Sequence, residues 1–297
     1  MLTETLHYGQ DHVLQSVTIT TLPQTRDTGY WVILIHGGAW RDPNQTATRY
    51  LSGAASILTT SPIYTSTTLP RIAAFASIDY RLSPHPNHPQ DRSTTNPREF
   101  REAKHPDHIH DVQRALAFLQ QKYGFGERYI LVGHSCGATL AFQSVMGLFR
   151  STDSGGLSSP SPTAILGMAG IYDIRLLRDT YQGISIYQQF LEEAFGSDES
   201  VWDAVSPALV EGPSGVEGGW NAGRLAVLAH SSEDRLVDLK QRDVMRQALA
   251  SWEKGHPRKD STRVEILSIK GDHNDSWEKG DELARAIAFT LGKLDDE

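Results

Sequence analysis

Short apolar runs alternate along the chain with longer segments of helical periodicity. Residues 31–35, Trp-Val-Ile-Leu-Ile, are apolar at every position, which is typical of a strand buried on both faces of a parallel sheet. Residues 17–21 alternate between apolar and polar side chains, and this pattern predicts a strand at the edge of the sheet. The further strands that we predict cover residues 72–78, 129–132, 164–168, 225–228 and 264–269.

Four segments between the predicted strands carry apolar residues at helical spacing. In the first of them, Val112, Leu116 and Leu119 fall on one face of a helix. Strands that alternate with helices of this length predict an α/β fold, in which a mostly parallel sheet is covered by helices on both faces. The predicted helices cover residues 107–123, 138–149, 238–252 and 277–291.

Two segments stand outside this alternation. Residues 83–104 are rich in Pro, Asn, Asp and Arg and have no apolar period, which predicts a long surface loop. Residues 174–220 contain short helical pieces and then a Gly-rich stretch. Insertions of this kind often cover an active site. We therefore predict one domain over residues 1–297, with lid insertions at 83–104 and 174–220.

The composition is that of a soluble globular protein, with 39% hydrophobic and 22% charged residues. The formal net charge of −8 argues against a nucleic-acid partner, because such proteins need a basic surface. The same charge disfavours an anionic membrane surface. The sequence leaves the oligomeric state, monomer or homodimer, open.

The cell compartment can be inferred from three features. Cys136 is the only cysteine, so no disulfide can form within the chain, which fits a reducing compartment. The first residues lack the basic and apolar regions of a signal peptide. The apolar runs also fall short of the ~20 residues that a membrane span needs. We expect a cytoplasmic protein.

A nucleophile elbow is the clearest chemical motif. Residues 133–137 read Gly-His-Ser-Cys-Gly and match the pattern G-x-S-x-G. The predicted strand at 129–132 leads into the motif and the predicted helix at 138–149 leads out of it, as a sharp strand-to-helix turn requires. This context disfavours the alternative of a Gly-rich turn with an incidental serine. Ser135 is the predicted nucleophile.

The loop after the predicted strand at 31–35 reads His-Gly-Gly-Ala-Trp. Adjacent glycines let the main chain approach a substrate, and loops of this type supply backbone N–H groups to a developing oxyanion. We predict that Gly37 and Gly38 are donors, together with the N–H group of Cys136 after the nucleophile. The N–H group of Ala39 is a weaker third candidate.

The remaining catalytic residues should follow late strands, in the chain order serine, acid, histidine. The loop after the predicted strand at 225–228 supplies Asp234, and the loop after the last predicted strand supplies His273. Glu233 and Asp238 are the rival acids. Asp238 is placed to cap the following helix, so Asp234 is preferred.

Several other side chains suggest different chemistry. His105, His108 and His110 lie close together in sequence, but three histidines at a helix start do not converge on one ion, so we predict no metal site. We expect His36 to brace its own loop. We expect the Cys136 thiol to point away from the site, which argues against a cysteine hydrolase.

Together these motifs resemble the hormone-sensitive-lipase-like branch of the α/β-hydrolases. The residues that carry the resemblance are His-Gly-Gly-Ala-Trp at 36–40, Asp-Tyr-Arg-Leu-Ser-Pro at 79–84, the elbow at 133–137, Asp234 and His273. Trp40, followed by Arg-Asp-Pro, makes the oxyanion loop similar to that of kynurenine formamidases, particularly the fungal ones.

The resemblance implies an α/β-hydrolase fold and a small aromatic formamide as substrate. The reaction would convert N-formyl-L-kynurenine to L-kynurenine and formate, in tryptophan catabolism and de novo NAD biosynthesis, without a cofactor. It implies a triad of Ser135, Asp234 and His273, and Trp40 would close the acyl side of the substrate pocket. Two alternatives stay open: a short-chain carboxylesterase, and a hydrolase-like binding protein without activity.

Overall fold

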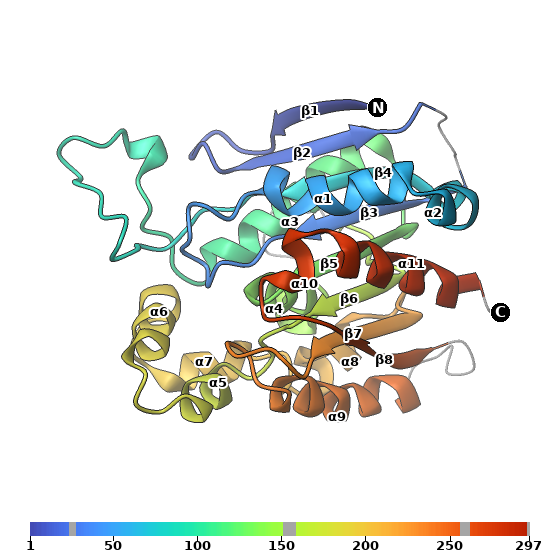
Figure 1. Cartoon of the computed structure of the whole chain (residues 1–297). Helices are drawn as coiled ribbons and strands as arrows, with labels where there is room; N and C mark the ends of the chain where they lie inside the picture. The colour runs from blue at the N-terminus through green and yellow to red at the C-terminus, as the bar shows by residue number, and fades with distance from the viewer. Residues whose placement is uncertain (24–27, 151–158, 256–261, 296–297) are drawn as a thin grey trace.

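An eight-stranded sheet forms the centre of the molecule (Figure 1). The computed structural model describes residues 1–23, 28–150, 159–255 and 262–295. The strands lie in the order β1-β2-β4-β3-β5-β6-β7-β8; β2 is antiparallel to both neighbours, and the neighbours from β4 onward are parallel. The strands are β1 (Leu2–His7), β2 (Ser16–Thr21), β3 (Tyr30–Ile35), β4 (Ile72–Ile78), β5 (Tyr129–His134), β6 (Ala164–Met168), β7 (Leu225–Ser231) and β8 (Arg263–Ile269).

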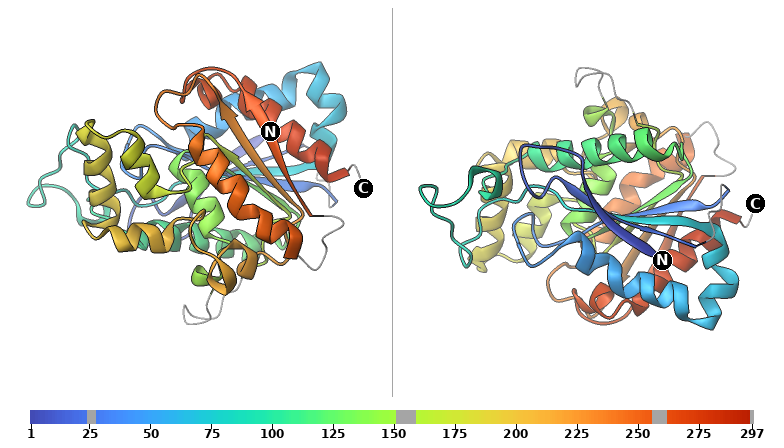
Figure 2. Two further views of the ribbon diagram at one scale, coloured as in Figure 1. Left: turned by 90° about the horizontal axis from the view of Figure 1, so that it is seen from below. Right: turned by 90° about the horizontal axis from the view of Figure 1, so that it is seen from above.

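Helices cover both faces of the sheet (Figure 2). Neighbouring residues of β3 explain why: Val32 belongs to the buried cluster on one face and Ile33 to the cluster on the other. The first face is covered by α1 (Ala47–Thr60), α10 (Asp275–Glu278) and α11 (Asp281–Asp295), with α2 (Pro62–Thr67) after α1. The second face is covered by α3 (Asp107–Tyr123), α4 (Cys136–Gln143) and α9 (Lys240–Gly255).

Residues 83–104 and the first part of residues 174–220 project from the end of the sheet where the parallel strands finish, whereas the last part of 174–220 returns along the sheet (Figures 1 and 2). Residues 83–104 form a long loop with one short turn, η2 (Pro97–Glu99). Residues 174–220 form α5 (Ile174–Thr180), α6 (Ser185–Phe195), α7 (Glu199–Val205), η4 (Gly212–Ser214) and α8 (Val216–Gly219). The other short turns are η1 (Leu69–Arg71) and η3 (Gly147–Phe149).

The edge of the sheet differs from the prediction. Residues 17–21 lie in β2, which is the second strand, because β1 pairs with its outer side. β1 is almost wholly exposed and has only two apolar residues, so its sequence pattern is weak. It is held by its antiparallel pairing with β2, by hydroxyl pairs such as Thr3 with Thr20 at 3.0 Å, and by Leu6, which packs against the core.

Two predicted helices are shorter or divided. The helix after the elbow ends at Gln143 and is followed by η3. The predicted helix at 277–291 is divided into α10 and α11, and the break falls at Gly280, whose φ of 82° an L side chain rarely adopts. The sequence prediction also missed α1 and α2.

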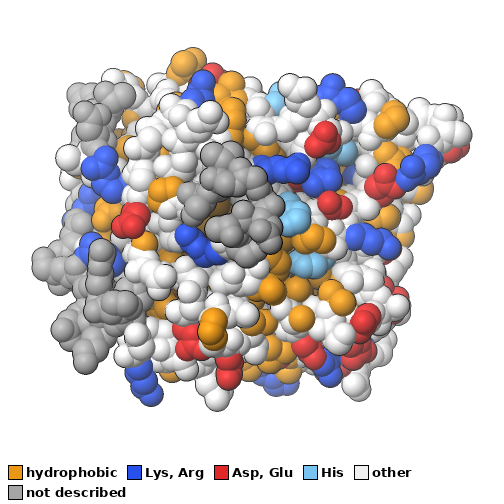
Figure 3. All heavy atoms as spheres, turned by 180° about the vertical axis from the view of Figure 1, so that it is seen from behind, with side chains coloured by type: hydrophobic (Ala, Val, Ile, Leu, Met, Phe, Trp, Pro, Cys, Tyr) orange, Lys and Arg blue, Asp and Glu red, His pale blue; other side chains and the backbone are white. Residues whose placement is uncertain are grey.

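The surface carries charges of both signs. On the face in Figure 3, acidic and basic side chains are interspersed rather than gathered by sign. In the described part of the chain, no helix has both the length and the apolar character to cross a bilayer.

A buried ion pair joins the segment after β4 to α3. Asp111 is completely buried and accepts hydrogen bonds from Nε and Nη2 of Arg81 at 2.8 and 2.9 Å. The backbone N–H group of Arg81 and the side-chain amide of Gln15 donate to the same carboxylate. The pair therefore fixes the backbone just before the long loop of residues 83–104.

We predict that Asp111→Ala lowers the free energy of unfolding by about 3 kcal/mol, because it leaves a partly buried guanidinium without its main partner. The control is Asp107→Ala. Asp107 is 40% exposed and contacts the same Arg81 at 3.3 Å, so its loss should cost less than about 1 kcal/mol. Urea unfolding measures both values, and equal losses would contradict this account of the buried pair.

Candidate active site

The elbow places Ser135 between β5 and α4. Its φ of 53° and ψ of −123° are strained for a residue with a side chain. Glycines on either side permit this turn: a Cβ at Gly133 would meet the backbone of Ala138, and a Cβ at Gly137 would meet the carbonyl of His36 at 2.6 Å. Ser135 is held further by its N–H group, which donates to the carbonyl of Met168 at 2.9 Å.

The loop after β3 presents its backbone beside the elbow. A Cβ at Gly37 would lie 3.1 Å from the Cβ of Ser135, so the glycine and the serine are direct neighbours. Among the described residues, the N–H groups of Gly37 and Gly38 donate to no backbone or side-chain acceptor. Cys136 is the first residue of α4, and the first N–H groups of a helix have no partner within it. These three donors suit a negatively charged oxygen.

His36 and Tyr80 brace this loop from beneath. Nδ1 of His36 donates to the carbonyl of Gly37 at 2.8 Å. The hydroxyl of Tyr80 donates to the carbonyl of His36 at 3.1 Å, and the two rings stack with centroids 4.5 Å apart. Burial lowers the pKa of His36. Because these contacts engage carbonyl groups, they leave the N–H groups of Gly37 and Gly38 available.

The Cys136 side chain points away from the nucleophile and into this bracing layer. Its sulfur accepts the N–H group of Trp40 at 3.3 Å. Burial raises the pKa of the thiol to about 11, although hydrogen bonds from Tyr80, Trp40 and Ala39 oppose the shift. The thiol therefore stays protonated at neutral pH and is not a nucleophile.

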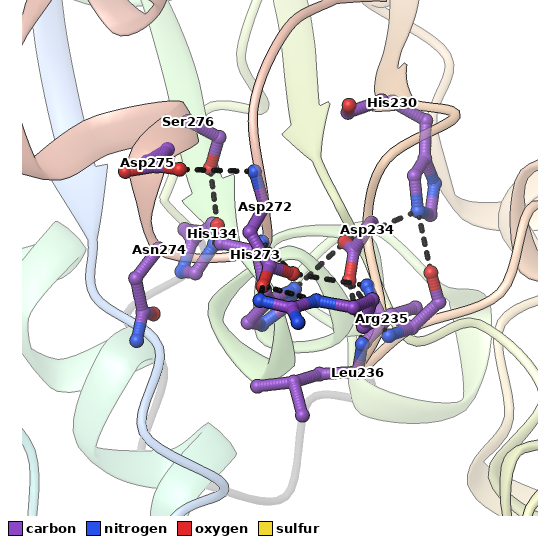
Figure 4. Close-up of polar contacts among 12 residues, drawn as sticks. His134, His230, Asp234, Arg235, Leu236, Asp272, His273, Asn274, Asp275 and Ser276 are labelled. Atoms are coloured by element: carbon purple, nitrogen blue, oxygen red, sulfur yellow. Dashed lines mark hydrogen bonds and ion pairs between the residues drawn. The ribbon is translucent and has the colours of Figure 1, made fainter.

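Asp234 and His273 come together from the loops after β7 and β8 (Figure 4). Nδ1 of His273 donates to Oδ2 of Asp234 at 2.8 Å. The other oxygen, Oδ1, accepts the backbone N–H groups of Leu236 and Val237, each at 2.9 Å. The Asp234 side chain is 1% exposed. The carboxylate is thus fixed on both oxygens and directed at one nitrogen of the imidazole.

The protonation state of Asp234 results from opposing effects. Burial alone would raise its pKa, but hydrogen bonds from His230, His273 and the backbone of Val237 outweigh burial and hold the pKa well below the ordinary value. The group is therefore ionised at neutral pH. An ionised partner stabilises the positive charge that His273 would take up as a base.

Two further histidines adjoin this pair, and the sequence prediction missed both. Nε2 of His230 donates to the carbonyl of Val237 at 2.9 Å and lies 3.4 Å from Oδ2 of Asp234. Nε2 of His134 donates to the carbonyl of His273 at 3.1 Å. Their sequence signals are the spacing of four residues from His230 to Asp234 and the place of His134 inside the elbow motif.

The residues considered as an alternative acid or as metal ligands have other contacts. Oδ1 of Asp238 accepts the N–H group of Lys240 at the start of α9, as a helix cap does. Nε2 of His108 contacts the hydroxyl of Ser83 at 3.1 Å, and the His105 ring stacks on Phe195. Among the described residues, no group of three or more metal-binding side chains could hold an ion.

Trp40 is fully buried and has no surface open to a substrate. Its ring packs edge-on against Phe195 at 4.9 Å and near Phe190 at 6.3 Å, both in α6. The next residue, Arg41, is also buried, and its Nη1 contacts Glu193 of α6 at 2.5 Å. The oxyanion loop and the 174–220 insertion are therefore joined. The Trp40 ring lies between the oxyanion loop and α6. Its role in the substrate pocket stays a prediction.

A mostly parallel sheet with a serine elbow and a histidine in the loop after its last strand defines an α/β-hydrolase. The BD-FAE family model matches residues 19–249. The chain is 41% identical to the kynurenine formamidase-like hydrolase fscH of Fusarium equiseti, over 90% of this chain and 85% of that protein. It is 35% identical to the kynurenine formamidase avaC of Aspergillus versicolor, over 90% of each. The chain belongs to the kynurenine formamidase family.

Solved structures agree on the fold. A truncated carbohydrate esterase from gut microbiota superposes with a TM-score of 0.67 at 18% identity, over 99% of this chain and 96% of that one. Esterase B from Lactobacillus Rhamnosis (HN001) superposes with a TM-score of 0.65 at 15% identity, over 99% of this chain and 87% of that one. At such identities the likeness concerns the fold alone.

We predict that Asp234→Asn lowers the rate of hydrolysis by about 10⁴-fold, because an amide would favour the wrong histidine tautomer. Asp238→Asn is the matched control, since it changes a helix cap one turn away and should leave the rate within a few fold. Steady-state kinetics on a chromogenic ester compares the two variants. A larger loss for the second variant would transfer the role of the acid to Asp238.

Proposed function

We propose that this chain hydrolyses N-formyl-L-kynurenine to L-kynurenine and formate with a triad of Ser135, Asp234 and His273. The observation that carries the proposal is the hydrogen bond of 2.8 Å between His273 Nδ1 and Asp234 Oδ2. Both residues follow the carboxyl ends of parallel strands, as Ser135 does. Relatives at 35% and 41% identity are named kynurenine formamidase or kynurenine formamidase-like. Both sources support the same reaction class, cleavage of an amide by an activated serine.

The first step is the attack of Ser135 Oγ on the formyl carbon. Because Nδ1 of His273 donates to Asp234, Nε2 is unprotonated and accepts the serine proton. A new C–O bond forms, and the carbonyl electrons move to the formyl oxygen. The N–H groups of Gly37, Gly38 and Cys136 would bind this oxyanion, and one such donor is typically worth about 3–4 kcal/mol in the transition state.

Collapse of this intermediate breaks the C–N bond. The protonated His273 gives its proton to the departing aromatic nitrogen, which leaves as the free amine, and the formyl group stays as an ester on Ser135. Water then attacks this ester with His273 again as base, formate is released, and the serine recovers its proton. Asp234 stays ionised throughout and stabilises the imidazolium in both steps.

The small acyl group is consistent with the way the oxyanion loop is held. A formyl carbon carries only hydrogen, so the acyl side of the site can be tight. Trp40 and Arg41 fix the loop to α6 by aromatic packing and by the ion pair with Glu193. We propose that residues 174–220 act as a wall of the site and residues 83–104 as part of its mouth.

The cellular role follows from the proposed substrate. Release of L-kynurenine would place the chain in tryptophan catabolism, ahead of de novo NAD biosynthesis, and we expect it to act in the cytoplasm without a cofactor.

We predict that Ser135→Ala abolishes turnover of N-formyl-L-kynurenine and labelling by a fluorophosphonate, because both need the Oγ atom. Residual catalysis of about 10³–10⁴ over water could come from the oxyanion loop and substrate binding. Thermal unfolding of the variant should match the wild type, since only one oxygen is removed. Near-normal turnover in Ser135→Ala would end the serine-hydrolase proposal.

We predict that the enzyme prefers the smallest acyl group. Each extra methylene in a fitted pocket costs roughly 1–3 kcal/mol, or about 10–200-fold in rate. Formyl anilides should therefore exceed acetyl anilides by at least about tenfold in kcat/KM, and butyryl anilides should be poorer still. The measurement is kcat/KM over the three anilides. Equal or better turnover of the butyryl compound would favour a general carboxylesterase.

A further inference from the structure

His134 lies where three parts of the site meet. It is the last residue of β5 and precedes Ser135 in the chain. A Cβ at Gly37 would lie 2.6 Å from its Nδ1, so the ring rests directly against the oxyanion loop. On the other side, its ring centroid lies 4.6 Å from that of His273. One buried side chain therefore contacts the loops of the oxyanion donors and of the base.

The polar contact of His134 fixes its tautomer. Nε2 lies 3.1 Å from the carbonyl oxygen of His273, and because a carbonyl only accepts, Nε2 carries the proton. The same carbonyl accepts the hydroxyl of Ser276 at 2.6 Å. These two donors can fill both lone pairs of the oxygen. The backbone of His273 is thereby held from β5 on one side and from α10 on the other.

His134 also stays neutral beside the base. It is 2% exposed, and burial, followed by the charge of His273, lowers its pKa well below the ordinary value. Its ring packs against Tyr50 and Trp277 with centroids 6.1 Å away from each. A neutral donor with fixed surroundings can hold the His273 backbone without competing with it for the serine proton.

We propose that His134 is a positioning residue: its Nε2–H group holds the carbonyl of His273 so that the imidazole stays aligned with Ser135. This inference rests on the proposed triad. His134 does not itself touch the reacting atoms in this scheme. It acts by linking the nucleophile strand to the loop of the base, so its loss should slow the chemical step more than it weakens substrate binding.

The test compares His134→Leu with His134→Gln. Leucine fills much of the space without a donor, whereas the glutamine amide can place an N–H group near the position of Nε2. We expect His134→Leu to lower kcat by about 10- to 100-fold, since a small misplacement of a catalytic group costs this much. KM should change little, and His134→Gln should restore most of the rate.

The matched control is Tyr50→Phe. Tyr50 packs on the same ring, and its buried hydroxyl has no hydrogen-bond partner within the described residues, so the variant should keep the wild-type rate. Equal losses in His134→Leu and His134→Gln, or no loss in His134→Leu, would overturn the proposal. A rise of KM in place of a fall of kcat would do the same.

A double-mutant cycle with Ser276→Ala tests the shared carbonyl. If both donors act through the carbonyl of His273, the combined variant should depart from the product of the single effects. Strictly multiplicative effects would contradict a common point of action. Where His134→Leu does not fold, the cycle is repeated with His134→Phe, which keeps an aromatic ring without the donor.

The rate of fluorophosphonate labelling separates this proposal from the proposed substrate. Labelling reports the attack of Ser135 and needs no formamide. If the wild type labels rapidly but does not cleave N-formyl-L-kynurenine, the substrate proposal fails, and the variants still test His134 through the labelling rate. We expect labelling to slow in His134→Leu by the same factor as kcat.

Discussion

In the active site, the buried negative charge of Asp234 has to be compensated by nearby hydrogen-bond donors. The desolvation of such a charge costs several kcal/mol unless hydrogen bonds replace the lost water. Two backbone N–H groups, the imidazole of His273 and the nearby His230 supply that replacement. If the loops after β7 and β8 moved apart, the buried charge of Asp234 would lose its partner. This constraint fixes the base relative to the sheet.

The oxyanion side of the site is held by a different kind of contact. Carbonyl groups of the loop after β3 are engaged from beneath by His36 and Tyr80, and the Cys136 thiol takes up the Trp40 N–H group. Trp40 and Arg41 join the loop to α6 by aromatic packing and by a partly buried ion pair. The same short segment thus connects the donors for the oxyanion with the insertion that shapes the site, so a change in α6 can reach the chemistry.

The sequence was informative where a local pattern sets the structure. A continuous apolar run predicted β3, and the glycines around Ser135 predicted the turn that the structure shows at φ 53°. The closeness of Asp234 and His273 followed from strand ends in a parallel sheet. Contacts between distant segments left no such pattern: threonine hydroxyls pair between β1 and β2, Trp40 packs against α6, and His134 donates to a backbone carbonyl. Every residue has a backbone carbonyl, so the residue type does not indicate which carbonyl accepts a side-chain hydrogen bond.

Selectivity for one acyl group has to come from outside the sheet. Esterases superpose on nearly the whole chain at only 15–18% identity, so the sheet and elbow place a serine and a histidine without defining what they cleave. Residues 83–104 form a long loop, and residues 174–220 add short helices outside the sheet framework. They contact the catalytic framework at defined points, for example where Tyr187 of α6 donates to the carbonyl of Leu236, two residues after Asp234. An insertion fixed to both the oxyanion loop and the acid loop is suited to act as a rigid wall, and a rigid wall excludes a larger acyl group by a steric cost that a mobile lid would relieve.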